Sequence, residues 1–146
     1  MVWYFDDEPF IPTEDYLKKF EGFVYLITNL TNGKRYIGRK YLFSIRKVKN
    51  KTKRQRSNSD WMEYWSSSNS VKEDIEILGK DNFKREILVL CKTRGDTNRM
   101  EEFYQWKYNV LENDNWYNDS IGKMKGPTER IIEGRIYSKN VENFGD

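Results

Sequence analysis

The sequence predicts an α+β fold in which a small three-stranded antiparallel sheet is flanked by helices. Two short runs of β-branched and aromatic residues, 23–28 and 35–40, are separated by the turn dipeptide Asn32-Gly33, which is typical of a β-hairpin. A third apolar run at 83–90 follows a segment with helical spacing. Because a two-stranded ribbon is marginally stable by itself, this third run is expected to complete the sheet.

The first 20 residues are interpreted as an N-terminal extension whose aromatic side chains pack on the domain or on a partner. Pro9 and Pro12 should keep its first part irregular, because proline has no backbone N–H to donate. Thr13 is placed to cap a short helix that runs to Lys19, since its hydroxyl can accept from the free N–H groups of a first helical turn.

Helices are predicted on the C-terminal side of the hairpin. Apolar residues recur at helical spacing over residues 71–78, and Gly79 is a favourable C-terminal stop. Residues 97–111 form the longest helix candidate, with apolar residues gathered on one side. The strand at 83–90 is expected to be the most buried of the three, and a further short helix is expected near residues 128–133.

Length and composition suggest how the chain is organised. A chain of 146 residues fits one domain, which we place at residues 21–118, with a basic insertion at 46–60 and a C-terminal extension at 119–146. No apolar run approaches the ~20 residues that span a bilayer. The acidic, aromatic N-terminus does not look like a signal peptide. We therefore expect a cytoplasmic protein with no membrane partner.

Two residue types exclude whole classes of chemistry. The sequence contains no histidine, which excludes Ser-His-Asp hydrolases, histidine-ligated zinc and nucleases with a histidine base. Cys91 is the single cysteine, so the chain has neither a disulfide framework nor a cysteine metal cluster. No Asp/Glu-x-Lys triplet occurs, which argues against the common carboxylate–lysine nuclease site. Tyrosine, lysine, arginine, asparagine and carboxylates remain as catalytic groups.

The net charge of +3 says less than its distribution. Residues 46–56 hold seven cations and no acid, a concentration that favours a phosphate-binding surface. A solvated loop is the alternative interpretation. The candidate DNA contacts are all of these cations except Arg46, together with two cations of the second strand. They are Arg39, Lys40, Lys47, Lys49, Lys51, Lys53, Arg54 and Arg56.

Five features, in order along residues 23–118, resemble the motifs of the GIY-YIG nucleases. They correspond to the two tyrosine motifs, a catalytic arginine ten residues after the second tyrosine, a metal-binding glutamate and a terminal asparagine. The matching residues are Val24-Tyr25, Tyr36-Ile37-Gly38, Arg46, Glu101 and Asn118.

The resemblance implies a GIY-YIG-like fold and a DNA endonuclease that leaves 5′-phosphate and 3′-hydroxyl ends. Its catalytic residues would be Tyr25, Tyr36, Arg46, Glu101 and Asn118, with Glu101 holding Mg²⁺ or Mn²⁺. Double-stranded DNA is the implied partner, and a monomer and a dimer both remain open. The resemblance is nearest to phage-encoded, homing-type members, in which case the location is the host cytoplasm.

The sequence also departs from the family pattern. Phe23 replaces the glycine of the first motif, and Arg39 follows Gly38 where many members have lysine. Asn50 stands near a position that is histidine in some homing enzymes. Gly22 lies one residue before Phe23, and any role of that histidine is absent or moved to another residue.

Hydrolysis needs an activated water and charge stabilisation on the phosphate. The Arg46 guanidinium matches phosphate oxygens. Tyr25 or Tyr36, as tyrosinate, could take the proton of the water. Free tyrosine has a pKa of about 10, so ionising it at pH 7 costs roughly 4 kcal/mol, which nearby cations must offset. The residues leave open which tyrosine is the base.

Simpler interpretations remain. The two tyrosines could be a cross-strand packing pair, Glu101 could be a solvated helix carboxylate beside Glu102, and Asn118 could simply cap a turn. Two other functions compete with the nuclease: a non-catalytic nucleic-acid-binding module or repressor, and an interaction protein that docks through its aromatic N-terminus. The first needs no metal, and the second predicts no salt-dependent DNA binding.

Overall fold

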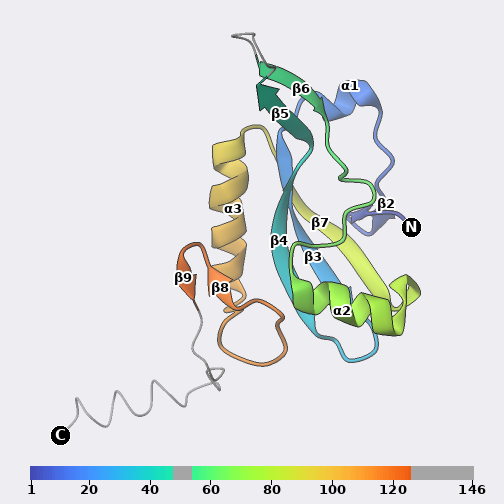
Figure 1. The fold of residues 1–146 in the computed structure, drawn as a ribbon, viewed down its shortest axis with the longest axis vertical. Helices are drawn as coiled ribbons and strands as arrows, with labels where there is room; N and C mark the ends of the chain where they lie inside the picture. Colours follow the sequence, from blue (N-terminus) through green and yellow to red (C-terminus); the bar gives the residue numbers. More distant parts are fainter. Residues whose placement is uncertain (48–53, 126–146) are drawn as a thin grey trace, which may run out of the picture.

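The computed structural model describes residues 1–47 and 54–125. Its centre is a mixed five-stranded sheet with the strand order β2-β1-β7-β3-β4 (Figure 1). The strands of this sheet are β1 (Tyr4–Phe5), β2 (Glu8–Pro9), β3 (Gly22–Asn29), β4 (Arg35–Tyr41) and β7 (Phe83–Cys91). The α+β class is confirmed.

The predicted three-stranded antiparallel sheet is too small. β3 does pair antiparallel with β4 and with β7, but β1 adds to β7 in parallel and β2 pairs antiparallel with β1. The N-terminal segment therefore contributes to the sheet as well as packing on it. Strands of two residues carry no readable periodicity, and Pro9 argues against a strand, yet proline is tolerated at a sheet edge, which is where β2 lies.

The β3–β4 hairpin forms at the predicted turn. The Gly33 N–H donates to the carbonyl of Asn29, and Gly33 takes a positive φ of 75° that glycine adopts without strain. The central strand β3 pairs on both sides and is buried at six of its eight positions. It is more buried than β7, so the prediction that the strand at 83–90 would be the most buried is wrong.

The helices begin at side-chain caps. Thr13, Ser68 and Thr93 each accept from a backbone N–H of the first turn. They start α1 (Glu14–Leu17), α2 (Asn69–Leu78) and α3 (Arg94–Lys107), and the 3₁₀ turn η1 (Lys80–Asn82) follows α2. The predicted cap and stop at Thr13 and Gly79 are confirmed.

The long helix α3 is displaced from its predicted range of 97–111. It begins three residues earlier, because the cap is Thr93, and ends at Lys107, since Asn109 takes a positive φ of 52° that breaks the helix. The helix predicted near 128–133 lies outside the described residues. Two hairpins complete the fold: β5 (Phe43–Lys47) with β6 (Arg54–Asn58), and β8 (Ser120–Ile121) with β9 (Met124–Lys125).

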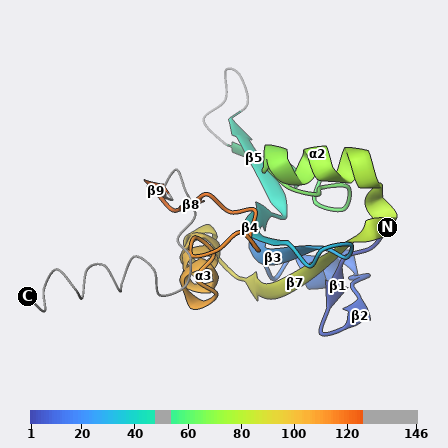
Figure 2. The same ribbon diagram turned by 90° about the horizontal axis from the view of Figure 1, so that it is seen from below.

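The sheet separates two cores. Seen along the strands, α2 covers one face of the sheet, while α3 runs beside the β4 edge (Figure 2). Phe23, Tyr25 and Ile27 point to the α2 side and pack with Trp3 and Trp61. Val24 of β3 and Ile37 of β4 pack in a second cluster with residues that follow α3, namely Val110, Leu111, Trp116 and Ile121. This alternation is the period-two pattern of a strand buried on both faces.

A buried arginine fixes the loop over the α2 side. Arg85 of β7 donates to the carbonyls of Met62 at 3.0 Å, of Tyr64 at 2.8 Å and of Met1. Its guanidinium also lies 4.7 Å from the Trp3 ring. Burial lowers the pKa of Arg85 to about 10, partly offset by Glu63. The loop that carries residues 62–65 is therefore held against the sheet.

Candidate functional site

The two motif tyrosines lie diagonally across the β3–β4 hairpin. Tyr25 pairs with Gly38 and Ile27 with Tyr36, which places both rings on the α2 side with centroids 6.1 Å apart. A Cβ on Gly38 would lie only 2.6 Å from Cζ of Tyr25 and 2.8 Å from Cε1 of Tyr36. The glycine of the second motif is therefore required because both rings pack across its Cα.

Tyr25 is enclosed in the core. The side chain is fully buried, and its hydroxyl makes no hydrogen bond of ordinary geometry among the described residues, although Tyr64 and Ser66 lie beside it. Burial raises the pKa of Tyr25 well above its usual value, and the neighbouring Tyr36 and Tyr64 add to the shift. The packing interpretation of this tyrosine is the one its surroundings favour.

Tyr36 instead lines a pocket of about 220 Å³. Burial raises the pKa of Tyr36, Ser67 acts in the opposite direction, and the charges of Glu101 and Asp119 raise it further. The remaining residues of this pocket, which we call the tyrosine pocket, are Arg39, Gln105, Asn118, Ser120 and Gly122. The pocket therefore combines one of the two candidate bases with the predicted metal ligand.

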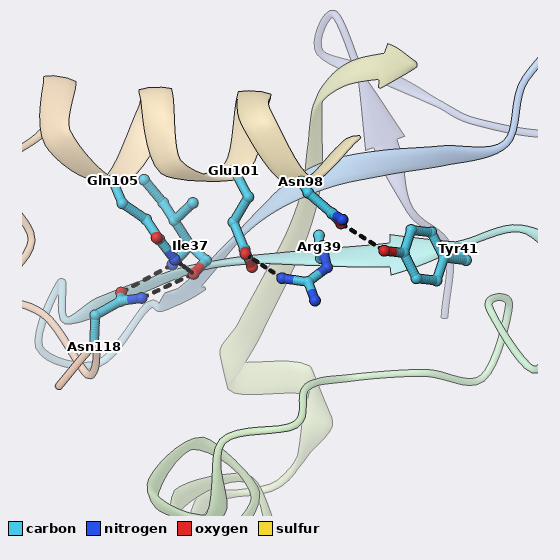
Figure 3. Close-up of polar contacts among 7 residues, drawn as sticks. All are labelled: Ile37, Arg39, Tyr41, Asn98, Glu101, Gln105 and Asn118. Atoms are coloured by element: carbon cyan, nitrogen blue, oxygen red, sulfur yellow. Dashed lines mark hydrogen bonds and ion pairs between the residues drawn. The ribbon is translucent and has the colours of Figure 1, made fainter. Parts of the chain in front are cut away.

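Helix α3 reaches β4 through three polar side chains on one face (Figure 3). Asn98 accepts from the Tyr41 hydroxyl at 2.5 Å, Glu101 pairs with Arg39, and the Gln105 amide donates to the carbonyl of Ile37 at 3.1 Å. The spacing i, i+3, i+7 on the helix meets alternate residues of the strand, because each strand step of two residues spans about 6.6 Å, close to one helical turn of 5.4 Å. The sequence contains this spacing but does not reveal its partner.

Glu101 is the central member of this set. Its Oε1 lies 2.6 Å from Nη1 of Arg39, and its side chain is only 12% exposed. Burial raises the pKa of the Glu101 carboxyl, while the Arg39 guanidinium acts to lower it and Glu102 adds to the rise. Glu102 lies instead against Gly122, where a Cβ would be 3.2 Å from Cδ of Glu102. The geometry favours Glu101 over Glu102 as the pocket carboxylate.

Asn118 closes the outer edge of β4. Its Oδ1 accepts from the Ile37 N–H at 3.0 Å, and its Nδ2 donates to the Ile37 carbonyl at 2.8 Å. Two residues earlier on β4, the Arg35 N–H donates to the Asn115 carbonyl, and the Tyr117 N–H donates to the Arg35 carbonyl. The amide of Asn118 is thus engaged in holding the edge strand beside Tyr36. A direct catalytic role for it stays a prediction.

Arg39 lines the tyrosine pocket, while the cations of the basic run lie on β5 and β6 or outside the described residues. Arg46 pairs with Gln55 along the β5–β6 backbone, and its catalytic role stays a prediction. Lys47 and Arg54 are partners in the same hairpin, while Lys49, Lys51 and Lys53 lie outside the described residues. Two others are already engaged: Lys40 with Asp60 at 2.6 Å, and Arg56 with Glu21 at 2.8 Å.

A larger pocket of about 490 Å³ adjoins the tyrosine pocket and shares Arg39, Ser67 and Glu101 with it. Its other residues include Lys40, Tyr41, Phe43, Ser44, Ser59, Tyr64 and Arg94. Arg94 carried no motif signal and was not predicted. Only its position at the start of a capped helix, next to a strand end, could have indicated it.

The donors at the tyrosine pocket fit a hard divalent cation. Within residues 1–47 and 54–125 no group of three or more His, Cys, Asp or Glu side chains could hold a metal, so an all-protein cage is absent from this part. Glu101 supplies one carboxylate beside an open pocket. Mg²⁺ keeps several waters and is commonly bound by one or two carboxylates together with substrate phosphates, which matches this donor set.

Comparison with known proteins identifies a matching family. Residues 3–121 match the family model described as "Putative endonuclease segE, GIY-YIG domain". No curated protein and no solved structure shows a significant match. Among the described helices, none has the length and apolar character needed to cross a membrane.

Proposed function

The chain belongs to the GIY-YIG endonuclease superfamily, and from this premise we propose that it is a divalent-metal-dependent DNA endonuclease that leaves 5′-phosphate and 3′-hydroxyl ends. One observation carries the proposal. Tyr36 and Arg39 of β4 line one pocket with Glu101 of α3, which is 62 positions beyond Arg39 in the sequence. A half-buried carboxylate, a guanidinium and a phenol at an open pocket are the groups that phosphodiester hydrolysis needs.

Each residue has a separate task in this proposal. Glu101 would hold Mg²⁺ or Mn²⁺, and the bound cation would stabilise negative charge on the phosphate and the leaving oxygen. Arg39 lies against Glu101 and would bind a phosphate oxygen once the cation neutralises that carboxylate. Asn118 and Gln105 fix the Ile37 peptide, and with it the strand that carries Tyr36.

We assign the general base to Tyr36 rather than Tyr25. A base must come within hydrogen-bond reach of the attacking water, and Tyr36 lines the pocket whereas Tyr25 is fully buried. The electrostatics agree with this choice. Burial is the largest cause of the raised pKa of both tyrosines, but at Tyr36 the Glu101 charge adds to the rise, and a bound cation would neutralise that charge.

Plasmid cleavage tests the proposal. Wild-type protein with Mg²⁺ should convert supercoiled plasmid to nicked or linear DNA, and a chelator should stop the reaction. Glu101→Gln should lower the rate by about 100-fold or more, the size of effect seen when one electrostatic stabiliser is removed. Glu102→Gln is the matched control and should cut within about threefold of wild type.

Two results would argue against the proposal. Equal cutting by the wild type and Glu101→Gln would remove Glu101 from the chemistry. Salt-dependent DNA binding by the wild type, without cleavage of any substrate in Mg²⁺ or Mn²⁺, would favour the non-catalytic binding module instead.

A further inference from the structure

The larger pocket beside the tyrosine pocket carries an uncompensated positive charge. Three cations line it, Arg39, Lys40 and Arg94, against the single carboxylate of Glu101. Arg39 is paired with Glu101, and Lys40 is paired with Asp60, each at 2.6 Å. Arg94 makes no ion pair with any carboxylate of the described residues. Its charge therefore faces the pocket without a counter-ion from this part of the chain.

Arg94 also stands where helix electrostatics disfavour it. It is the first residue of α3, and the N-terminus of a helix carries partial positive charge, so a cation there is unfavourable. An anion bound beside Arg94 would interact favourably with both the guanidinium and the helix N-terminus. Residues that oppose their local preference are expected at functional or strained sites.

The guanidinium is nonetheless held in place by its neighbours. Nη2 of Arg94 donates to the carbonyl of Phe43 at 2.6 Å, and the guanidinium carbon lies 4.1 Å from the centre of the Tyr41 ring. Tyr41 is fixed in turn by its hydrogen bond to Asn98, one turn after Arg94 on the same helix (Figure 3). A planar fork that is already oriented loses little entropy when it binds a phosphate.

We propose that the larger pocket binds a backbone phosphate of the same DNA strand, next to the phosphate at the tyrosine pocket, with Arg94 as its anchoring cation. The proposal rests on the proposed nuclease function, because it takes the substrate strand to run through both pockets. Each strand of a duplex carries one phosphate per about 3.4 Å of helix axis. A strand with one phosphate beside Tyr36 and Glu101 must therefore carry others past the adjoining pocket.

Salt-dependent binding tests this site separately from cleavage. Affinity for a short labelled duplex is measured by fluorescence anisotropy in chelator, over a series of KCl concentrations. Arg94→Gln should weaken binding about tenfold at low salt and reduce the slope of log K against log [KCl] by roughly 0.9, the loss of one phosphate contact. Arg99→Gln is the matched control, since Arg99 lies on the same helix, is highly exposed and pairs with Asp96.

Arg94→Lys provides a second arm in case Arg94→Gln does not fold, which circular dichroism would show. Lysine keeps the charge but not the fork, so the slope should stay at the wild-type value while the affinity falls several-fold. An unchanged slope in folded Arg94→Gln would overturn the site, as would an equal loss in Arg99→Gln. Arg94→Lys binding as tightly as the wild type would also overturn it.

The outcomes separate the two proposals. A reduced slope in Arg94→Gln, from a wild type that never cuts DNA, would keep the phosphate site and remove the nuclease function. Normal Mg²⁺-dependent cleavage, with a slope that Arg94→Gln leaves unchanged, would keep the nuclease and remove the phosphate site.

Discussion

Tyr25 and Tyr36 stand on the same side of one hairpin and pack on the same core, yet they differ in access to solvent. Tyr25 belongs to β3, which pairs with a strand on each side, and its ring is buried among other aromatics. Tyr36 belongs to β4, the edge of the sheet, and reaches a pocket. The two residues share a chemistry, and only the second is placed to use it. The position of a strand in the sheet decides which tyrosine meets solvent.

The edge also explains how residues from both faces meet. Tyr36 packs against the α2-side core, whereas Glu101 comes from α3 beside the other cluster. Within the interior of a sheet two such residues would be separated by the strands. At β4 they line one pocket, because nothing beyond the strand divides the two faces there, and Asn118 and Gln105 secure the exposed backbone.

Replacing Tyr36 should have the largest effect on cleavage. Tyr36→Phe should lower the rate of Mg²⁺-dependent plasmid cleavage by about 10²–10⁴-fold, the usual contribution of a general base. Stability should change little, because the hydroxyl lies at a pocket. Single-turnover cleavage at saturating enzyme measures the effect. Retention of half the wild-type rate would mean that Tyr36 is not the base.

The pH dependence of the cleavage rate tests the assignment of Tyr36 as the base without altering the lining of the pocket. The pKa of Tyr36 is raised above its ordinary value, so the active tyrosinate is the minor form throughout the neutral range. The rate should therefore rise about tenfold per pH unit below that pKa, from pH 6 towards pH 9. In Tyr36→Phe the profile should lose this rise. A wild-type rate that stays flat, with chemistry limiting, would count against a tyrosinate base.

Asn118→Ala tests whether the edge of β4 must be closed. The substitution leaves the buried N–H of Ile37 without its partner, which costs about 1–3 kcal/mol. Urea unfolding should show this loss, and cleavage should fall because the strand that carries Tyr36 is less firmly held. Asn115→Ala, an exposed residue of the same segment, is the control. Full stability in Asn118→Ala would show that the two hydrogen bonds contribute nothing.

Tyr25→Phe should have the smallest effect, and it tests whether the buried tyrosine contributes to cleavage. Among the described residues the buried Tyr25 hydroxyl makes no hydrogen bond of ordinary geometry, so its removal should leave the free energy of unfolding unchanged or raise it by up to about 1 kcal/mol. Cleavage should remain within about threefold of wild type. A loss of activity like that of Tyr36→Phe would reverse the assignment of the base.

Local chemistry in the sequence predicted the local structure well. Asn32-Gly33 indicated the hairpin, since tight turns need positive φ, and Gly33 has it. Thr13 marked the start of a helix because its side chain accepts from a backbone N–H of the first turn. Gly79 marked the end of a helix because glycine adopts a positive φ without strain. The two added strands were missed because pairs such as Tyr4-Phe5 and Glu8-Pro9 are too short to show a period.

For the candidate site, the sequence alone determined the set of groups: two tyrosines, a glutamate, an asparagine and a family pattern, with histidine excluded. Their arrangement in space follows from the packing of the folded chain. It buried Tyr25, opened Tyr36 to a pocket, paired Glu101 with Arg39 and placed Arg94 beside them. The physical reason is that burial and edge position arise from long-range strand pairing and helix packing, which no local run of residues records.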